Sequence, residues 1–242
     1  MDGKDLGDKV DKVDKGEIYS ITPLSPISPK SLTGIVLAGG LSSRMGEDKA
    51  LLTIRGVPLL RVVSDVAIAL CESVYIITPW TERYQHVVSP MCQFIKEIPL
   101  LGSREDLGDL GEKMHTRPRA PTNGPLVGFA QGLAHVQTDW VLLLACDLPK
   151  LQIDVLQTEV AKLDNVEAEA IALLAKNSKG WEPLCGFYRR SCLPALKQYI
   201  NSGGRSFQQW LAQHPVQVLP LSDGQMLFNC NTPADYAALN DI

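Results

Sequence analysis

The stretch GIVLAGGLSSRMGEDKALL, residues 34–52, joins an apolar run to a turn that contains two consecutive glycines. The apolar run predicts a buried parallel strand. The turn leaves backbone N–H groups able to bind phosphate oxygens, because no Cβ blocks their approach at Gly39 and Gly40. Arg44 adds a planar guanidinium and Lys49 a compact ammonium. The stretch matches neither the Walker A spacing nor the dinucleotide fingerprint, and an ordinary glycine turn with solvated cations is the alternative.

A second element, LLLACDLPKL at residues 142–151, places Asp147 where an apolar strand ends before a proline. Packing explains such a carboxylate poorly, because an unpaired buried charge is costly. It suits an oxygen ligand of Mg²⁺, which takes one or two carboxylates together with substrate phosphates. A helix N-cap is the alternative role for Asp147. If the two strands lie side by side, Lys49 and Asp147 face one crevice, and metal-assisted phosphoryl or nucleotidyl transfer is the favoured reaction class.

Strand and helix patterns alternate along the rest of the chain, which predicts an α/β protein with βαβ units, a mostly parallel sheet and helices on both faces. The expected strands are 32–40, 73–78, 92–97, 139–149, 168–175, 183–190 and 215–221. The expected helices are 58–72, 124–136, 151–164, 192–203, 205–214 and 232–241.

The chain divides into a tail and one domain. Residues 1–30 alternate acids and lysines and then become rich in Pro and Ser, so we expect a disordered N-terminal tail. Residues 31–242 form a single expected domain. Within it, residues 99–124 are polar and rich in Gly and Pro, which predicts a long loop or insertion near the carboxyl ends of the strands.

Composition narrows the class of partner and the compartment. The net charge of −4 argues against a nucleic-acid partner. No apolar run approaches the roughly 18 residues of a membrane span, so we expect no membrane contact. Six scattered cysteines without a CxxC pair indicate reduced thiols in a cytoplasmic protein.

Four motifs together resemble the molybdenum cofactor guanylyltransferases, within the wider group of Mg²⁺-dependent nucleotidyltransferases. They are LAGGLSSRMGEDKALL, GPLVGFAQGL, LLLACDLPKL and FNCNTPADY, and they extend over residues 34–240. The resemblance implies a Rossmann-like three-layer α/β/α fold. It also implies transfer of GMP from GTP to the phosphate of molybdopterin, with release of pyrophosphate and with Mg²⁺ as cofactor. Cofactor-biosynthesis proteins or apo-molybdoenzymes are further partners that it implies.

The resemblance also implies roles for particular residues. Backbone groups of Leu37, Ala38 and Gly39, with Gly40 beside them, would contact GTP. Lys49 would hold the triphosphate, Asp147 would coordinate Mg²⁺, and Arg44 would join both in catalysis. Asn229 and Asn231 would lie toward the pterin or near the metal. Relatives that use CTP usually have Ala-Ala-Gly where this chain has Ala38-Gly39-Gly40, so Gly39 favours guanine.

At two positions the chain departs from the family. Where the family has an Asn after the second strand, Thr78 is the nearest candidate for the GTP contact. Where it has an Asp at the end of the third strand, this chain has Glu97, and Asp106 or Asp109 are alternatives. The open functional alternatives are a cytidylyl- or other nucleotidyltransferase on a different phosphorylated acceptor, and a non-catalytic nucleotide-binding adaptor.

Overall fold

The computed structural model describes residues 31–39, 48–100, 123–221 and 224–240. Its centre is a seven-stranded sheet in the order β5-β4-β1-β6-β8-β7-β9. The strands are β1 Leu32–Leu37, β4 Ser73–Thr78, β5 Cys92–Lys96, β6 Trp140–Ala145, β7 Ala172–Asn177, β8 Gly180–Arg189 and β9 Val216–Val218. A separate short hairpin pairs β2 Thr53–Ile54 with β3 Val57–Pro58.

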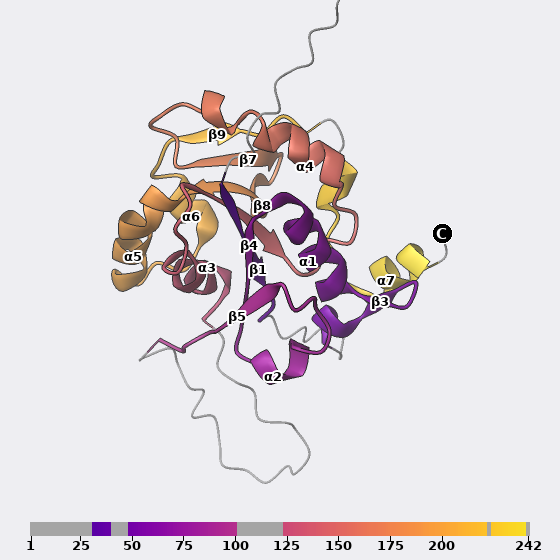
Figure 1. Ribbon diagram of the computed structural model, residues 1–242. Helices are drawn as coiled ribbons and strands as arrows, with labels where there is room; N and C mark the ends of the chain where they lie inside the picture. The colour runs from indigo at the N-terminus through magenta and orange to yellow at the C-terminus, as the bar shows by residue number, and fades with distance from the viewer. Residues whose placement is uncertain (1–30, 40–47, 101–122, 222–223, 241–242) are drawn as a thin grey trace, which may run out of the picture.

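Helices cover both faces of this sheet, as Figure 1 shows. One face carries α1 Leu59–Leu70 and α4 Ile153–Val160, and the other carries α3 Pro125–Leu133, α5 Leu193–Asn201 and α6 Phe207–Leu211. Beyond these lie α2 Thr81–Tyr84, α7 Pro233–Asn240 and four short 3₁₀ turns: Lys49–Leu51, Leu163–Asn165, Arg190–Cys192 and Gly224–Leu227. The expected three-layer α/β/α fold is therefore confirmed.

Within the seven-stranded sheet, all pairings are parallel except those of β8, which runs antiparallel to both β6 and β7. A tight turn with Gly180 at φ +128° sends the chain straight back from β7 into β8. The expected strand at 168–175 starts later, at Ala172, because residues 168 and 169 form a turn before it. The hairpin β2–β3 and the helix α2 have no counterpart among the expected elements.

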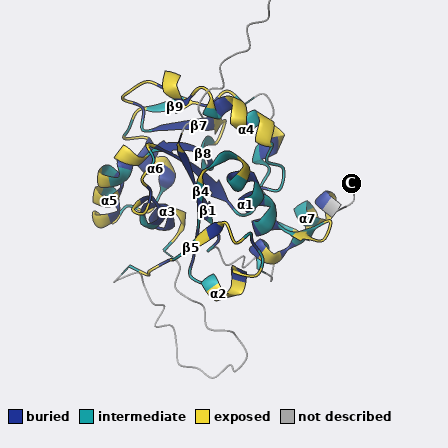
Figure 2. Ribbon diagram, viewed as in Figure 1, coloured by how far each residue is buried: buried dark blue, intermediate teal, exposed yellow. Residues whose placement is uncertain are grey.

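The core is split by the sheet into two apolar layers, and buried strands fill the middle of the molecule in Figure 2. Strand β6 is buried along its whole length because both of its faces are covered by helices. Within the described residues, no helix is both long and apolar enough to cross a membrane. The expected tail at 1–30 and most of the expected loop at 99–124 lie outside the described residues.

Candidate active site

The site begins where two parallel strands end side by side. β1 and β6 are neighbours, with Leu37 opposite Ala145. The next residue of the second strand continues this contact, since the Cys146 N–H donates to the Leu37 carbonyl at 3.1 Å. Asp147 therefore leaves the sheet beside the segment that follows Leu37. The carboxyl ends of parallel strands are where open α/β sheets bind their ligands.

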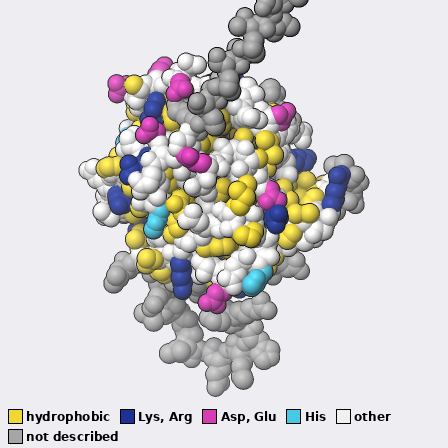
Figure 3. Space-filling view, viewed as in Figure 1, with side chains coloured by type: hydrophobic (Ala, Val, Ile, Leu, Met, Phe, Trp, Pro, Cys, Tyr) yellow, Lys and Arg dark blue, Asp and Glu magenta, His cyan; other side chains and the backbone are white. Residues whose placement is uncertain are grey.

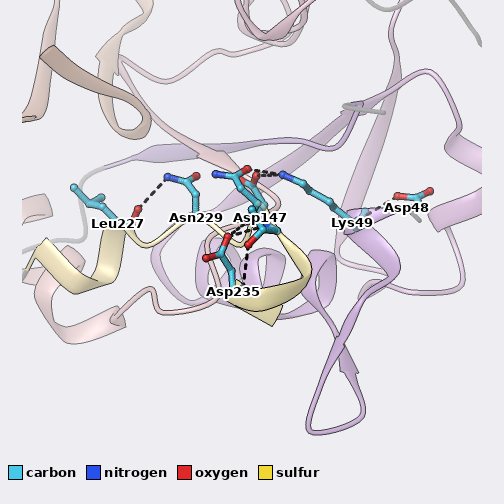
Figure 4. Close-up of polar contacts among 9 residues, drawn as sticks. Asp48, Lys49, Asp147, Leu227, Asn229 and Asp235 are labelled. Carbon is cyan, nitrogen blue, oxygen red and sulfur yellow. Dashed lines mark hydrogen bonds and ion pairs between the residues drawn. The ribbon is translucent and has the colours of Figure 1, made fainter. Parts of the chain in front are cut away.

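Lys49 reaches this edge from the 3₁₀ turn at Lys49–Leu51. Its Nζ lies 3.2 Å from Asp147 Oδ2 and 2.5 Å from Asn231 Oδ1. Figure 4 shows the Lys49 side chain extending toward Asp147. The Lys49 and Asp147 side chains are 16% and 18% exposed. Three residues far apart in the chain thus place the Lys49 ammonium between an Asp147 oxygen and an Asn231 oxygen, where it is partly shielded from solvent.

The C-terminal segment that carries Asn231 is fixed by local hydrogen bonds. The Cys230 N–H donates to the Asp147 carbonyl at 3.0 Å. Asp235 Oδ2 accepts from the N–H groups of Asn231 and Thr232, and the Asp235 N–H donates to Thr232 Oγ1. This reciprocal capping at the start of α7 lowers the pKa of the Asp235 carboxyl.

A third apolar cluster joins the segment around β2 and β3 to the C-terminal segment, next to the site. It contains Leu52 and Leu59 from the N-terminal part and Cys230 and Leu239 from the C-terminal part. The Tyr236 hydroxyl donates to the Thr53 carbonyl at 2.8 Å, so that α7 lies against the β2–β3 hairpin (Figure 1). Lys49 and Asn231 meet because the segments that carry them share this cluster.

Glu97, at the end of β5, lies on the other side of the glycine turn. A Cβ built on Gly39 would lie 2.9 Å from Glu97 Oε2, so the backbone approaches this carboxylate closely. Glu97 is 7% exposed, and its Oε1 accepts from the N–H and the Nδ2 of Asn123, both at 3.1 Å. Burial raises the pKa of the Glu97 carboxyl, and the Asn123 hydrogen bonds oppose that rise.

The other expected site residues are distributed as follows. Leu37, Ala38 and Gly39 lie at the end of β1, and the Ala38 N–H donates to the Ile77 carbonyl at 2.9 Å. Thr78 is fully buried, with its Oγ1 accepting from the Trp80 N–H, so its contact with GTP stays a prediction. Four of the expected residues lie outside the described residues: Gly40 and Arg44, and the alternative acids Asp106 and Asp109.

Asn229 directly follows Phe228, one of the residues that line a separate hollow. Its Nδ2 donates to the Leu227 carbonyl at 3.1 Å. Leu227 and Phe228, which precede it in the chain, line a hollow of about 650 Å³. Lys176, Glu182 and Gln225 also line this hollow. β7 ends at this hollow, and β7 is parallel to β6 because β8 reverses direction between them. The hollow therefore lies along the same edge of the sheet as Asp147.

Two cysteines adjoin the site, Cys146 before Asp147 and Cys230 between the two asparagines. Burial raises the pKa of both thiols, so they stay protonated near neutral pH and are poor nucleophiles. The cysteines of the chain are all described, and none forms a disulfide.

Several contributors were not found by sequence reasoning. Asn123 gave no signal, because its partner Glu97 is defined only by the folded sheet. Asp235 could have been found from the spacing of Thr232 and Asp235, which is that of a capping box. Asp48 directly precedes Lys49 in the sequence, but nothing in the sequence indicates the residues that its carboxylate contacts.

The sequence of this chain is similar to those of known nucleotidyltransferases. Residues 34–218 match the MobA-like NTP transferase domain. A probable molybdenum cofactor guanylyltransferase of Trichormus variabilis is 57% identical over 86% of this chain and 90% of its own length. One from Synechococcus elongatus is 42% identical over 86% of this chain and 98% of its own length.

Solved structures show the same fold. Molybdopterin-guanine dinucleotide biosynthesis protein A from Archaeoglobus fulgidus superposes with a TM-score of 0.64 at 20% identity, covering 86% of this chain and 97% of that protein. The domain match includes Lys49, Glu97 and Asp147. The chain therefore belongs to the family of MobA-like NTP transferases that includes these molybdenum cofactor guanylyltransferases.

Proposed function

We propose that this nucleotidyltransferase transfers GMP from GTP to the phosphate of molybdopterin and releases pyrophosphate. The observation that carries the proposal is the convergence of Lys49, Asp147 and Asn231 beside the end of β1. The names of the relatives at 57% and 42% identity support the same reaction. Scattered charges of both signs on the face seen in Figure 3 accord with a small anionic substrate bound locally.

Glu97 is the proposed acceptor for the guanine base. Guanine presents a ring N–H and an exocyclic amino group on one edge, and a carboxylate accepts from both. Glu97 Oε2 lies against Gly39, while Asn123 occupies Oε1 and holds the side chain in place. The backbone of Leu37, Ala38, Gly39 and Gly40 would complete the nucleoside contacts.

The site fits Mg²⁺ through its oxygen donors. Asp147 Oδ2 and Asn231 Oδ1 already converge on one cationic centre, the Lys49 ammonium. Within the described residues no cluster of three or more His, Cys, Asp or Glu is present, and Mg²⁺ needs only one or two carboxylates beside substrate phosphates. We therefore propose that Asp147 holds Mg²⁺, with Asn231 or Asn229 next to it. When bound, the ion would neutralise charge on the α-phosphate.

The chain's own residues would handle the remaining negative charge. An oxygen of the acceptor phosphate attacks the α-phosphorus of GTP, and the bond to the β-phosphate oxygen breaks, so that pyrophosphate leaves. A phosphate monoester is already anionic near neutral pH, so no strong base is needed. Lys49, turned from Asp147 toward the triphosphate, and Arg44 would take up charge on the leaving group. The hollow beside Asn229 would hold the acceptor.

The direct test measures pyrophosphate release from each of the four nucleoside triphosphates, with and without molybdopterin. We expect release from GTP that requires both molybdopterin and Mg²⁺. Equal turnover of CTP would favour the cytidylyltransferase alternative. GTP binding without any release of pyrophosphate would overturn the proposal and favour the non-catalytic adaptor.

Asp147→Asn tests the metal assignment because it removes the charge and keeps the shape. We expect turnover to fall by about 10²–10³-fold, the loss typical of removing one preorganised electrostatic group. Mn²⁺ binding in the presence of GTP, followed by electron paramagnetic resonance, should weaken in parallel. The control is Asp65→Asn, which breaks an exposed ion pair with Arg61 on α1. Unchanged Mn²⁺ binding in Asp147→Asn would remove Asp147 as the ligand.

We also propose a cytoplasmic location. The cysteines Cys71, Cys92, Cys185 and Cys192 are free thiols like the two at the site, and burial raises the pKa of each. Unpaired thiols are typical of reducing compartments.

A further inference from the structure

Asp48 makes more contacts than a helix cap requires. Its Oδ1 accepts from the Ala50 N–H at 3.2 Å, which caps the 3₁₀ turn that starts at Lys49. Its Oδ2 accepts from Arg83 Nη1 and from the Tyr84 hydroxyl, each at 2.8 Å. One oxygen satisfies the cap, so the two further donors on Oδ2 need another explanation.

Those two donors come from α2, which is fixed to the end of β4. Tyr84 is 1% exposed, and burial together with Asp48 raises the pKa of its hydroxyl, which therefore remains a donor. The Arg83 guanidinium lies 4.9 Å from the centre of the Trp80 ring, and the Asp48 hydrogen bond raises the pKa of Arg83. The Trp80 N–H donates in turn to Thr78 Oγ1. The Asp48 carboxylate is thus bound to the segment that directly follows β4.

We propose that Asp48, held by Arg83 and Tyr84, is a positioning residue that fixes the backbone of Lys49 for binding the triphosphate. The inference rests on the proposed function of Lys49. A lysine side chain has a long, flexible stem, so the range of its ammonium depends on where its Cα is held. Arg83 also occupies the carboxylate that lies next to Lys49 in the chain, which leaves the Lys49 ammonium directed toward Asp147.

The geometry separates this role from a purely structural one. The Asp48–Arg83 pair is partly exposed, at 18% and 36%, and exposed ion pairs contribute little to stability because solvent screens them. A misplacement of about 1 Å in a substrate-binding group can lower the rate by about 10²-fold. Loss of the pair should therefore affect turnover far more than folding.

The test compares Asp48→Asn and Arg83→Gln with the Asp65→Asn control. Asparagine remains a good N-cap, so Asp48→Asn keeps the 3₁₀ turn and weakens only the attachment to α2. We expect kcat for GTP to fall by roughly ten- to 100-fold, with a smaller change in KM. The melting temperature should change no more than in Asp65→Asn, whose kinetics should match the wild type.

Lys49→Ala distinguishes the possible failures. If Asp48 acts through Lys49, adding Asp48→Asn to Lys49→Ala causes no further loss of kcat. An equal loss in both backgrounds, or wild-type kinetics in Asp48→Asn, would overturn the proposal. If Asp48→Asn does not fold, Tyr84→Phe removes one donor and keeps the buried ring, and wild-type kinetics there would also overturn it. A wild-type protein that releases no pyrophosphate would refute the proposed function itself.

Discussion

Gly39→Ala adds one methyl group at the point where the glycine turn meets Glu97. Gly39 is not one of the described glycines with a positive φ, so alanine can adopt its backbone conformation. The new Cβ would lie 2.9 Å from Glu97 Oε2 and 3.2 Å from Pro79 Cδ. Because the first of these distances is closer than real contacts allow, either the carboxylate or the turn must move.

Glu97 has little room to move, since Asn123 holds its other oxygen through two hydrogen bonds of 3.1 Å. We expect the overpacking to cost about 1–3 kcal/mol of stability. Loss of one hydrogen bond between guanine and the carboxylate is worth about 1.5–3 kcal/mol. At about 1.36 kcal/mol for each factor of ten, kcat/KM for GTP should fall roughly ten- to 150-fold. CTP does not rely on that hydrogen bond, so its turnover should fall less.

The assay measures pyrophosphate release from GTP and CTP by Gly39→Ala and the wild type. Gly128→Ala is the matched control, because its new methyl group would lie 3.9 Å from Glu97 Cδ and 3.6 Å from Leu37 Cδ2, ordinary contact distances. The control should keep the wild-type preference for GTP. An unchanged ratio of GTP to CTP turnover in Gly39→Ala would refute the assignment of Glu97 to the base.

Four further predictions concern Glu97 and the helix α3. Because burial raises the pKa of Glu97, GTP affinity should weaken as the pH falls from neutral through that raised pKa; isothermal titration should find this dependence lost in Glu97→Gln. The stability that Glu97 contributes is present below its unfolded pKa and lost as pH rises through the folded one, so Glu97→Gln should raise the melting temperature at pH 8. Asn123→Ala should raise the pKa of Glu97 further, which shifts the pH profile of GTP binding upward, and an unshifted profile would contradict the contact. On α3, Gly128→Ala should stabilise by up to about 1 kcal/mol through helix propensity, whereas Gly132→Ala, whose Cβ would lie 2.8 Å from Ile77 Cδ1, should destabilise by about 1–3 kcal/mol in thermal unfolding.

The arrangement of Asp147 could be predicted from the sequence because it follows from strand ends. The apolar runs before Gly39 and Asp147 are long enough to identify two buried strands. Parallel strands present their carboxyl ends at one edge, and the register of Leu37 with Ala145 places these ends side by side. The proposed chemistry rests on the residues that follow these strands, Gly39 after β1 and Asp147 after β6.

The parts that could not be predicted depend on contacts between side chains from distant segments. Asp48 and Arg83 are 35 positions apart, and neither lies in a periodic pattern that would indicate its partner. α2 has only four residues, too few for a helical period. The β2–β3 hairpin turns at Arg55 and Gly56, which both have positive φ, as the central residues of a type I′ turn do. The usual residue before the glycine of such a turn is Asn, Asp or Gly, so Arg55 does not indicate the turn.

The site has two halves, and they are built on different physical terms. The half beside Glu97 is buried and held by neutral donors of the scaffold, so its shape is fixed before a ligand arrives. In the half beside Asp147, the Lys49 ammonium forms an ion pair with Asp147 and a hydrogen bond with Asn231. Such a pair must separate when a polyphosphate and a divalent ion bind, and it can do so because the new partners carry matching charges. Under the proposed function, choice of the base would therefore reside in the half beside Glu97 and chemistry in the half beside Asp147, which is why a methyl group at Gly39 should alter selectivity while leaving the contact between Lys49 and Asp147 intact.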